Sequence, residues 1–368
     1  MKEKICLVCV VVVCSVVIEV AAAVWTVVPS ANRGTVESLF NSVAVVADND
    51  VWAAGHWYDS RTARYRTFIQ RWNGSGWQIV STPDVGTGYN DLNGVAAAND
   101  ADAWAVGYRT DTTNGYSKTL ILHWNGSSWS VVPSPNPGPG NNVLYGVTAL
   151  SPGDAWAVGW YYDADFVGRP LVLRWNGSSW KQVAAPSAST YFNALQSVAA
   201  TGPADVWAGG YASVDGRYAT LLEHWDGSTW TVVPSPNVGA KHNRIRSVSA
   251  TSPLDAWAVG DSQTGGSLIE HWNGSAWSIV DHPVASGTHT FWGVSALAAN
   301  DAWVAGYVNA STGIQPLMEH WDGAAWQQQT PAQATPRPWL TAVSGLPGGD
   351  VWVVGGAGSS TLTMRMDR

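Results

Sequence analysis

The sequence predicts an all-β fold, a seven-bladed β-propeller of four-stranded antiparallel blades, and three observations lead to it. The tripeptide Asp-x-Trp recurs seven times at intervals of 46 to 52 residues, and a period near fifty is typical of propellers and solenoids. Each period holds four short runs rich in Val, Ile, Leu, Trp and Thr, bounded by Gly, Pro, Asn or Ser, as strands are. No run has a sustained 3.6-residue apolar period, so no helix is expected.

The second period gives the pattern of one blade. Its four strands are expected at residues 92–98, 102–108, 119–124 and 129–133. The pair Asn125-Gly126 joins the third strand to the fourth and indicates a tight hairpin of type I′, a turn in which both central residues have positive φ. Four antiparallel strands joined by tight turns make a propeller blade.

The ends of the chain indicate how the ring closes. The motif Trp-[Asn/Asp]-Gly-x-x-Trp is complete only six times, and the seventh copy is split. Residues 361–367 match a third strand without its hairpin, whereas residues 24–30 match the missing fourth strand. We therefore expect the N-terminal strand to complete the last blade, which leaves no open sheet edge. The expected blades span about 39–88, 89–141, 142–190, 191–240, 241–286, 287–336, and 337–368 with 24–30.

We expect residues 24–368 to form a single domain, one propeller ring, and the composition agrees with this expectation. Of the 24 tryptophans, 20 occupy three repeat positions, and a buried Trp removes roughly 150–250 Å² of surface from water. The repeat tryptophans are therefore the expected core. The net charge of −8, with five lysines, gives no basic footprint for nucleic acid.

The first 23 residues are similar to a secretory signal peptide. Lys2 and Lys4 precede an apolar run at 5–18, and small residues follow at 21–23; the run is short for a membrane span. We expect cleavage near residue 24, no membrane span afterwards, and a secreted or cell-surface domain; the alternative is an uncleaved anchor. All three cysteines lie at positions 6, 9 and 14, so the exported domain is expected to hold no disulfide and no cysteine metal site.

Two repeated polar positions are interpreted as structural. The Asp of Asp-x-Trp occurs in every blade, and a single active site has no use for seven copies spread around a ring. The residue before the third-strand Trp is His or Arg, for example His123 or Arg71. One His per blade does not converge on zinc, which needs three or four ligands, so we expect these cations to pair with the repeat Asp. No metal and no cofactor are predicted.

The non-repeating residues are the candidate binding site, because function usually lies on the variable part of a rigid scaffold. Four tryptophans fall outside the repeat and are expected on the face that carries the variable loops: Trp57, Trp160, Trp292 and Trp339. Tyrosines accompany them there, including Tyr58, Tyr108, Tyr161 and Tyr162. Such rings stack on sugars or grip peptides; the alternative is that they pack beneath their own loops.

One position in the first strand also varies from blade to blade. In chain order it is Asn41, Asn93, Tyr145, Gln196, Arg246, Trp292 and Thr341. The first strand lines the central channel of a propeller, so these side chains are expected to ring its mouth as a ligand floor.

The strand-two ending Trp-x-x-Gly, doubled at Gly209-Gly210 and Gly355-Gly356, together with the hairpin that leads to Trp, resembles the kelch repeat and the galactose-oxidase type of propeller. Galactose oxidase needs a cysteine cross-linked to tyrosine beside copper, and residues 24–368 contain no Cys, so that activity is not expected. The hairpin is also similar to the Asp-box of sialidases, but Asn73 and Gly74 are adjacent here.

We therefore expect an exported, monomeric, non-catalytic module for recognition or adhesion, which binds a carbohydrate or an extracellular protein through the variable face. The alternative is a hydrolase or lyase that acts on a polysaccharide at the channel mouth, which would need a carboxylate pair or a nucleophile with its base. The acids Glu37, Asp91 and Asp261 are scattered in the sequence and form no recognisable constellation. Arg244 and Arg246 are candidates to clamp a ligand carboxylate.

Overall fold

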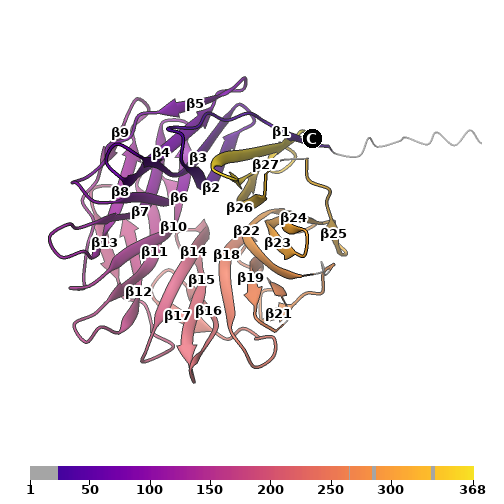
Figure 1. Ribbon diagram of the computed structural model, residues 1–368. Coiled ribbons are helices and arrows are strands. Elements are labelled where there is room, and N and C mark those ends of the chain that lie inside the picture. The colour runs from indigo at the N-terminus through magenta and orange to yellow at the C-terminus, as the bar shows by residue number, and fades with distance from the viewer. Residues whose placement is uncertain (1–23, 265, 284–286, 333–335) are drawn as a thin grey trace, which may run out of the picture.

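The computed structural model describes residues 24–264, 266–283, 287–332 and 336–368, which form a ring of seven four-stranded sheets around a central channel (Figure 1). Every neighbouring pair of strands within a sheet is antiparallel. The signal segment predicted at 1–23 and the cysteines within it lie outside the described residues. In the part of the chain that is described, no helix is long and apolar enough to cross a membrane.

The innermost strand of each blade faces the channel. In blade order these strands are β2 (Ser38–Ala47), β6 (Asn90–Asn99), β10 (Asn142–Ser151), β14 (Asn193–Gly202), β18 (Asn243–Ser252), β22 (Thr288–Ala298) and β26 (Pro338–Gly345). The second strand begins at or next to the repeat Asp. These strands are β3 (Asp50–Asp59), β7 (Asp102–Thr110), β11 (Asp154–Tyr162), β15 (Asp205–Val214), β19 (Asp255–Ser262), β23 (Asp301–Ala310) and β27 (Val351–Ala357).

The third and fourth strands form the outer half of each blade. The third strands are β4 (Arg64–Trp72), β8 (Ser117–Trp124), β12 (Gly168–Trp175), β16 (Arg217–Trp225), β20 (Gly266–Trp272), β24 (Gly313–Trp321) and β28 (Ser360–Met366). The fourth strands are short: β5 (Trp77–Val80), β9 (Trp129–Val131), β13 (Trp180–Val183), β17 (Trp230–Val233), β21 (Trp277–Ile279), β25 (Trp326–Gln328) and β1 (Trp25–Val27).

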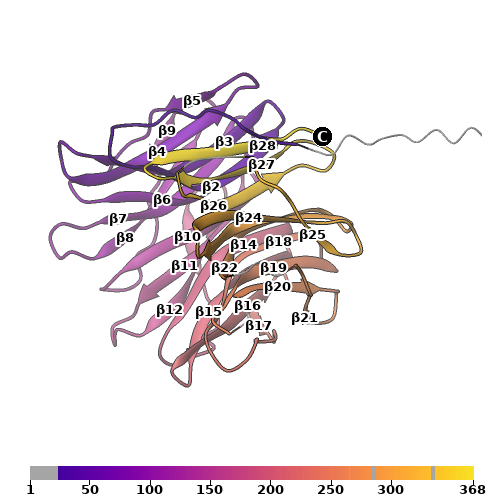
Figure 2. The same ribbon diagram turned by 45° about the vertical axis from the view of Figure 1, so that its right-hand side comes forward.

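The last blade is closed by the start of the chain, which confirms the predicted closure. Strand β1 pairs with β28 in register, with Trp25 opposite Met366 and Val27 opposite Met364. The three C-terminal strands β26, β27 and β28 complete that sheet (Figure 2). Trp25 is buried and lies edge-on to Trp303 of the preceding blade, with 5.5 Å between ring centroids.

The repeat tryptophans fill the spaces between blades. Trp52 of the first blade packs against Trp124 and Trp129 of the second, at centroid distances of 5.1 and 5.2 Å. Trp352 of the last blade contacts Trp72 and Trp77 of the first in the same way. Edge-to-face pairs of this kind add to the area that each indole buries, so neighbouring blades are held together by interlocked rings.

The predicted pairing of the repeat cation with the repeat Asp is present in every blade. Arg71 donates two hydrogen bonds to Asp50, His123 Nε2 lies 3.0 Å from Asp102 Oδ2, and the looser last pair, Arg365 with Asp350, is 3.7 Å apart. The remaining four pairs have the same geometry: Arg174 with Asp154, His224 with Asp205, His271 with Asp255, and His320 with Asp301. The cation also stacks on the neighbouring Trp, as Arg71 does on Trp52 at 4.7 Å.

The expected turn type between the third and fourth strands is wrong. Gly74 has a φ of 88°, but Asn73 is absent from the non-glycine residues with positive φ, so the turn is not type I′. Instead Asn73 Oδ1 accepts hydrogen bonds from the backbone N–H groups of Ser75 and Gly76. A carboxylate oxygen serves equally well, which explains why Asp226 occupies this place in the fourth blade.

The inner strands are longer than predicted toward the variable face. In the second blade the expected strands 92–98 and 102–108 extend to Asn90–Asn99 and Asp102–Thr110, whereas the fourth strand stops at Val131 instead of residue 133. Consequently Trp57 and Trp160, expected in loops, lie in β3 and β11, and Trp339, expected in a connection, lies in β26.

Candidate functional site: the mouth of the central channel

A β-bulge in each innermost strand creates the candidate site. In every blade the pairing of the first strand with the second skips one residue, as between Phe40 and Ser42 or between Leu92 and Gly94. The skipped residue is the position that varies from blade to blade. A bulge re-aims a side chain, and all seven of these side chains line one cavity of about 650 Å³ at the channel: Asn41, Asn93, Tyr145, Gln196, Arg246, Trp292 and Thr341.

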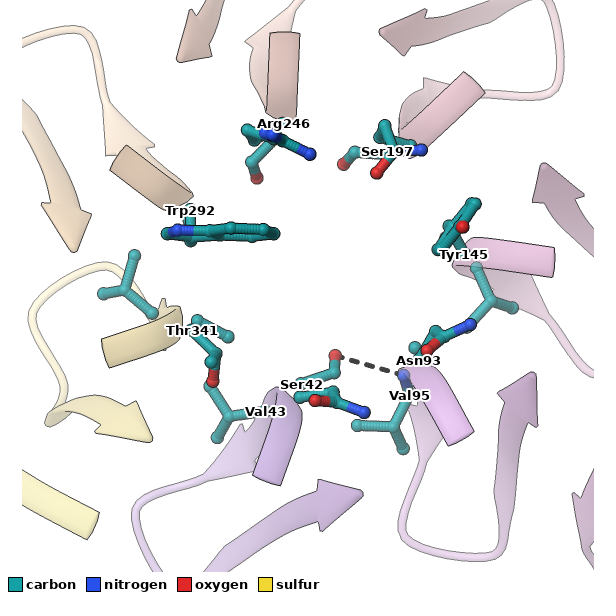
Figure 3. A pocket seen from close by; sticks show the side chains of 18 of the residues that line it. Ser42, Val43, Asn93, Val95, Tyr145, Ser197, Arg246, Trp292 and Thr341 are labelled. Carbon is teal, nitrogen blue, oxygen red and sulfur yellow. Dashed lines mark hydrogen bonds between the residues drawn. The ribbon is translucent and has the colours of Figure 1, made fainter. Parts of the chain in front are cut away.

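The residue after each bulge is small because the innermost strands approach one another closely. A Cβ added at Gly94 would lie 2.8 Å from the carbonyl oxygen of Tyr145, and one at Gly146 would lie 2.9 Å from Ser197 Cα. Where this residue is Ser, its hydroxyl links neighbouring blades: Ser42 Oγ accepts a hydrogen bond from the backbone N–H of Val95 (Figure 3). The ring at the mouth is therefore a rigid frame.

Trp292 forms one wall of the cavity. The Arg246 guanidinium lies 4.5 Å from the centroid of its indole, and the opposite face of the indole is turned toward the open centre (Figure 3). Tyr145 stands across the channel, and Tyr307 and Trp339 complete the aromatic part of the lining. An indole face that is open on one side and supported on the other is a suitable platform for a flat apolar ligand surface.

The polar side chains of the lining differ from one side of the ring to the other in the hydrogen bonds that they can offer to a ligand. Asn41 donates through Nδ2 to Asp91 Oδ1 and to the carbonyl oxygen of Leu92, and Asn93 donates through Nδ2 to the carbonyl oxygen of Leu144. Thr341 donates to the carbonyl oxygen of Phe40. Asn41 thus uses both of its N–H groups and Thr341 its hydroxyl hydrogen, whereas Asn93 uses one of its two N–H groups. The groups that remain for a ligand on this side are therefore mostly the amide and hydroxyl oxygens, which accept hydrogen bonds.

Arg246 lies on the other side of the cavity and is held by a buried carboxylate. Its Nε donates to Asp261 Oδ1 at 2.9 Å, while Arg244 donates to Asp261 Oδ2 through Nε and Nη2 at 3.0 and 2.7 Å. The two arginines thus clamp a carboxylate of the chain itself, and only Arg246 lines the cavity. Arg244, the other candidate to clamp a ligand carboxylate, lies outside the lining of this cavity.

The sequence-predicted residues Trp57, Tyr58 and Tyr108 do not line the cavity. Trp57 lies beneath the guanidinium of Arg33 at 5.3 Å, so it packs under the N-terminal linker. Tyr58 lies edge-on to Tyr65, with 5.3 Å between centroids. Tyr108 pairs in register with Asp91, and burial raises the pKa of its hydroxyl.

Trp160, Tyr161 and Tyr162 also lie outside the cavity. Trp160 contacts Tyr162 and Phe192 at 4.9 and 5.1 Å between centroids, and Tyr161 packs into the space between blades. Contacts of this kind continue as an aromatic arc on the variable face over the second to the fifth blade: Tyr116, Phe166, Tyr162, Trp160, Phe192, Tyr211, Tyr218 and His242. Phe166 in this arc is 55% exposed with a φ of 57°, a conformation that is unfavourable for a bulky side chain.

The acids that the sequence left scattered form a network at the mouth, in the first and second blades. His56 Nδ1 donates to Asp91 Oδ1 at 2.9 Å, its Nε2 lies 3.6 Å from Glu37 Oε1, and Tyr65 donates to Glu37 Oε2 at 3.1 Å. Burial lowers the pKa of His56, but the hydrogen bond and charge of Asp91, with a smaller share from Glu37, raise it overall. His56 directly follows the Trp-x-x-Gly motif of the first blade, and the repeat pattern does not single it out.

This network has the residue types of an acid–base catalytic site, but its His and Tyr lack the free ring nitrogen and the lowered pKa that a catalytic base needs. Both ring nitrogens of His56 face carboxylates, so no free imidazole nitrogen is available to take a proton from a substrate. Burial, then the hydrogen bond to Glu37, raises the pKa of Tyr65, whereas a tyrosine that acts as a base needs a lowered pKa. The arrangement is that of a structural ion network.

A second group resembles a nucleophile with its base, in the fifth and sixth blades. His282 Nε2 lies 3.2 Å from Ser267 Oγ, and its Nδ1 lies 3.2 Å from Glu319 Oε1. Ser267 and His282 are 15 residues apart. Pairs of hydroxyl side chains with the same separation make the equivalent contact in other blades, as Thr67 does with Thr82 in the first blade and as further pairs do in the second and fourth blades. We therefore assign it to anchoring of the outer loop. Within the described residues, no group of three His, Cys, Asp or Glu side chains could hold a metal ion.

Comparison with known proteins shows the architecture. No family model matches the chain, and no curated protein matches it. Among solved structures, it is similar to YCF48 bound to D1 peptide, with a TM-score of 0.58 and 15% identity over 94% of this chain and 95% of that one. It is similar to the WD40 propeller domain of Doa1, with a TM-score of 0.59 and 12% identity over 93% of this chain and 97% of that one.

A polysaccharide lyase is similar as well. The ulvan lyase of family PL25, bound to -[GlcA(1-4)Rha3S]-, has a TM-score of 0.56 and 11% identity, over 90% of this chain and 94% of that one. These neighbours are not specifically kelch proteins, so the resemblance drawn from the repeat holds for the propeller and not for that subtype. At these identities the likeness shows a seven-bladed propeller and no specific function.

Proposed function

We propose that the domain is a non-catalytic recognition module that binds a carbohydrate in the cavity at the channel mouth. One observation carries this: the seven bulge residues converge on a single cavity of about 650 Å³ with an open indole face. This volume is typical of a small-molecule site. Hydroxyl-rich ligands with an apolar ring face suit a lining of acceptor oxygens beside Trp292.

A carbohydrate is favoured over a folded protein partner by the shape of the site. The variable residues point into the half-open mouth of the central channel rather than outward to a flat surface, and stable protein interfaces need about 800 Å² from each partner. Non-catalytic binding is favoured over hydrolysis or elimination by the mouth network, in which His56 is held between two carboxylates. Export, suggested by the signal-like N-terminus, would place a monomeric domain where extracellular glycans are available.

A glycan array with residues 24–368, followed by calorimetry on the best ligand, tests this proposal. Trp292→Thr introduces the residue that the last blade carries at the same position, Thr341, and should weaken binding by at least about 20-fold, the loss typical of a binding hot spot. Trp160→Ala, on the arc outside the cavity, is the matched control and should change affinity by less than about threefold.

Three outcomes would change the assignment. Equal loss from both variants, or from Trp160→Ala alone, would move the site to the aromatic arc. Release of shorter saccharides during the incubation would favour the enzymatic alternative. Binding of no glycan, with retention of a peptide, would replace the carbohydrate by a protein ligand.

A further inference from the structure

The two sides of the cavity differ in polarity, and this difference restricts the chemical class of ligand that fits. On the side of the first, second and last blades, Asn41, Asn93 and Thr341 each donate to a neighbouring backbone carbonyl group, and only Asn93 keeps a second N–H group. This side therefore mainly accepts hydrogen bonds from a ligand. Hydroxyl groups can supply such bonds, and a carboxylate cannot.

The opposite side has an excess positive charge. Among the described residues, Arg246 is the only charged side chain that lines the cavity. It shares Asp261 with Arg244, so two guanidinium groups face one carboxylate. Asp261 bonds to Nε of Arg246, and within the described chain no acceptor is recorded for its two Nη groups. The next charged groups, His56, Asp91 and Glu37, belong to the mouth network outside the lining.

The guanidinium is also fixed in orientation. Its Nε bond to Asp261 holds one edge at 2.9 Å, and Trp292 supports its plane at 4.5 Å. A planar guanidinium with free Nη groups matches the two oxygens of a carboxylate. Because Arg246 covers the face of Trp292 that is turned away from the open centre (Figure 3), one residue of a saccharide would supply the carboxylate and a neighbouring residue would stack on the open face.

We propose that the ligand is an acidic saccharide, with the carboxylate of a uronic acid on the Nη groups of Arg246, a neighbouring sugar ring on the open face of Trp292, and hydroxyls donating to the Asn41 and Asn93 side-chain oxygens. This rests on the proposed function and adds the chemical class of the ligand. The carboxylate is predicted to supply much of the affinity, since hydrogen bonds to charged groups are the stronger ones.

The experiment compares uronic acid trisaccharides with their carboxyl-reduced neutral counterparts by calorimetry. Glucuronate, galacturonate and mannuronate trimers are the probes. For the acid that binds best, reduction of the carboxyl groups should weaken binding at least about tenfold. Arg246→Gln introduces the residue that the fourth blade carries at the same position, Gln196, and should remove this preference, so that the acid binds no more tightly than the neutral trimer.

Arg244→Gln is the matched control, because it also loses contact with Asp261 but does not line the cavity. It should retain the preference for the acid. If the neutral trimer binds as tightly as the acid and Trp292→Thr still abolishes binding, the proposed function stands and the acidic ligand is refuted. If Arg246→Gln and Arg244→Gln act alike, the carboxylate site is refuted. If no saccharide binds, acidic or neutral, both proposals fall.

Discussion

Replacement of the buried Glu223 by a neutral residue should stabilise the protein relative to the wild type, and this gain should be larger at neutral pH than at acidic pH. Glu223 lies in β16 with its side chain fully buried, and neither carboxyl oxygen has a hydrogen-bond partner within the described residues. The second and third blades carry Leu122 and Leu173 at the same position, two residues before the third-strand Trp. Burial raises the pKa of Glu223 from 4.5 to about 8, so the folded state holds a proton that the unfolded chain releases.

The sign of the effect follows from proton linkage. The raised pKa means that the contribution of Glu223 to stability is complete below about pH 4.5 and is lost as the pH rises to about 8. Over that window the free energy of unfolding falls by about 1.4 kcal/mol for each pH unit, which amounts to about 5 kcal/mol in total. Glu270, whose pKa burial also raises to about 8, adds a similar slope.

Urea unfolding followed by tryptophan fluorescence, between about pH 5 and about pH 7.5 at constant ionic strength, measures this slope. Glu223→Gln should reduce it by about 1.4 kcal/mol per pH unit and stabilise the protein by about 4 kcal/mol at the upper end of the range. Glu223→Leu should do the same, because Leu fits this position in two other blades. Asp215→Asn, in an exposed turn, removes one carboxylate elsewhere and is the control for the change of charge. Equal slopes for wild type and Glu223→Gln would refute the reasoning.

Two further predictions concern closure and the loops that lead to the channel. Trp25→Ala should destabilise the protein by about 3–5 kcal/mol because the indole is buried against Trp303, whereas Val24→Ala, at a side chain that is 69% exposed, should cost less than about 0.5 kcal/mol; thermal unfolding compares them, and equal effects would mean that β1 does not close the ring. Asn142→Ala should cost about 2–4 kcal/mol, since the buried amide bonds to Gly138 and Gly140. The exposed Asn114→Ala is its control, and a cost for Asn142→Ala no larger than that of Asn114→Ala would show that the loop does not depend on this amide.

The fold could be predicted from the sequence because one physical requirement is repeated seven times. Each blade needs a Trp between itself and the next, and each repeat Asp needs its cation, so Trp52 and Asp50 have counterparts throughout the chain. The count of complete hairpin motifs then left β28 without a partner, and Trp25 supplied it. The turn type was missed because a dipeptide pattern does not reveal that Asn73 bonds through its side chain.

The candidate site could be predicted only in part. The bulge position varied while its neighbours repeated, which was sufficient to place Asn93 and Trp292 on one ring. Contacts among the non-repeating side chains were not visible in the same way. Nothing in the sequence indicated that Asp261 would engage Arg244 and Arg246 of its own blade, or that Asp91 of the second blade would meet His56 of the first. The first contact depends on the register of two strands and the second on the spacing of neighbouring blades, and no repeated pattern records either.

The central claim is that the bulge residues form a saccharide site at the channel mouth, and a crystal structure of the domain soaked with the uronate trimer that binds best tests it most directly. The account predicts a sugar ring on the open face of Trp292 and the carboxylate of an adjacent uronate residue at the Arg246 Nη groups. A trimer bound to the aromatic arc around Trp160, with only solvent in the cavity, would contradict it.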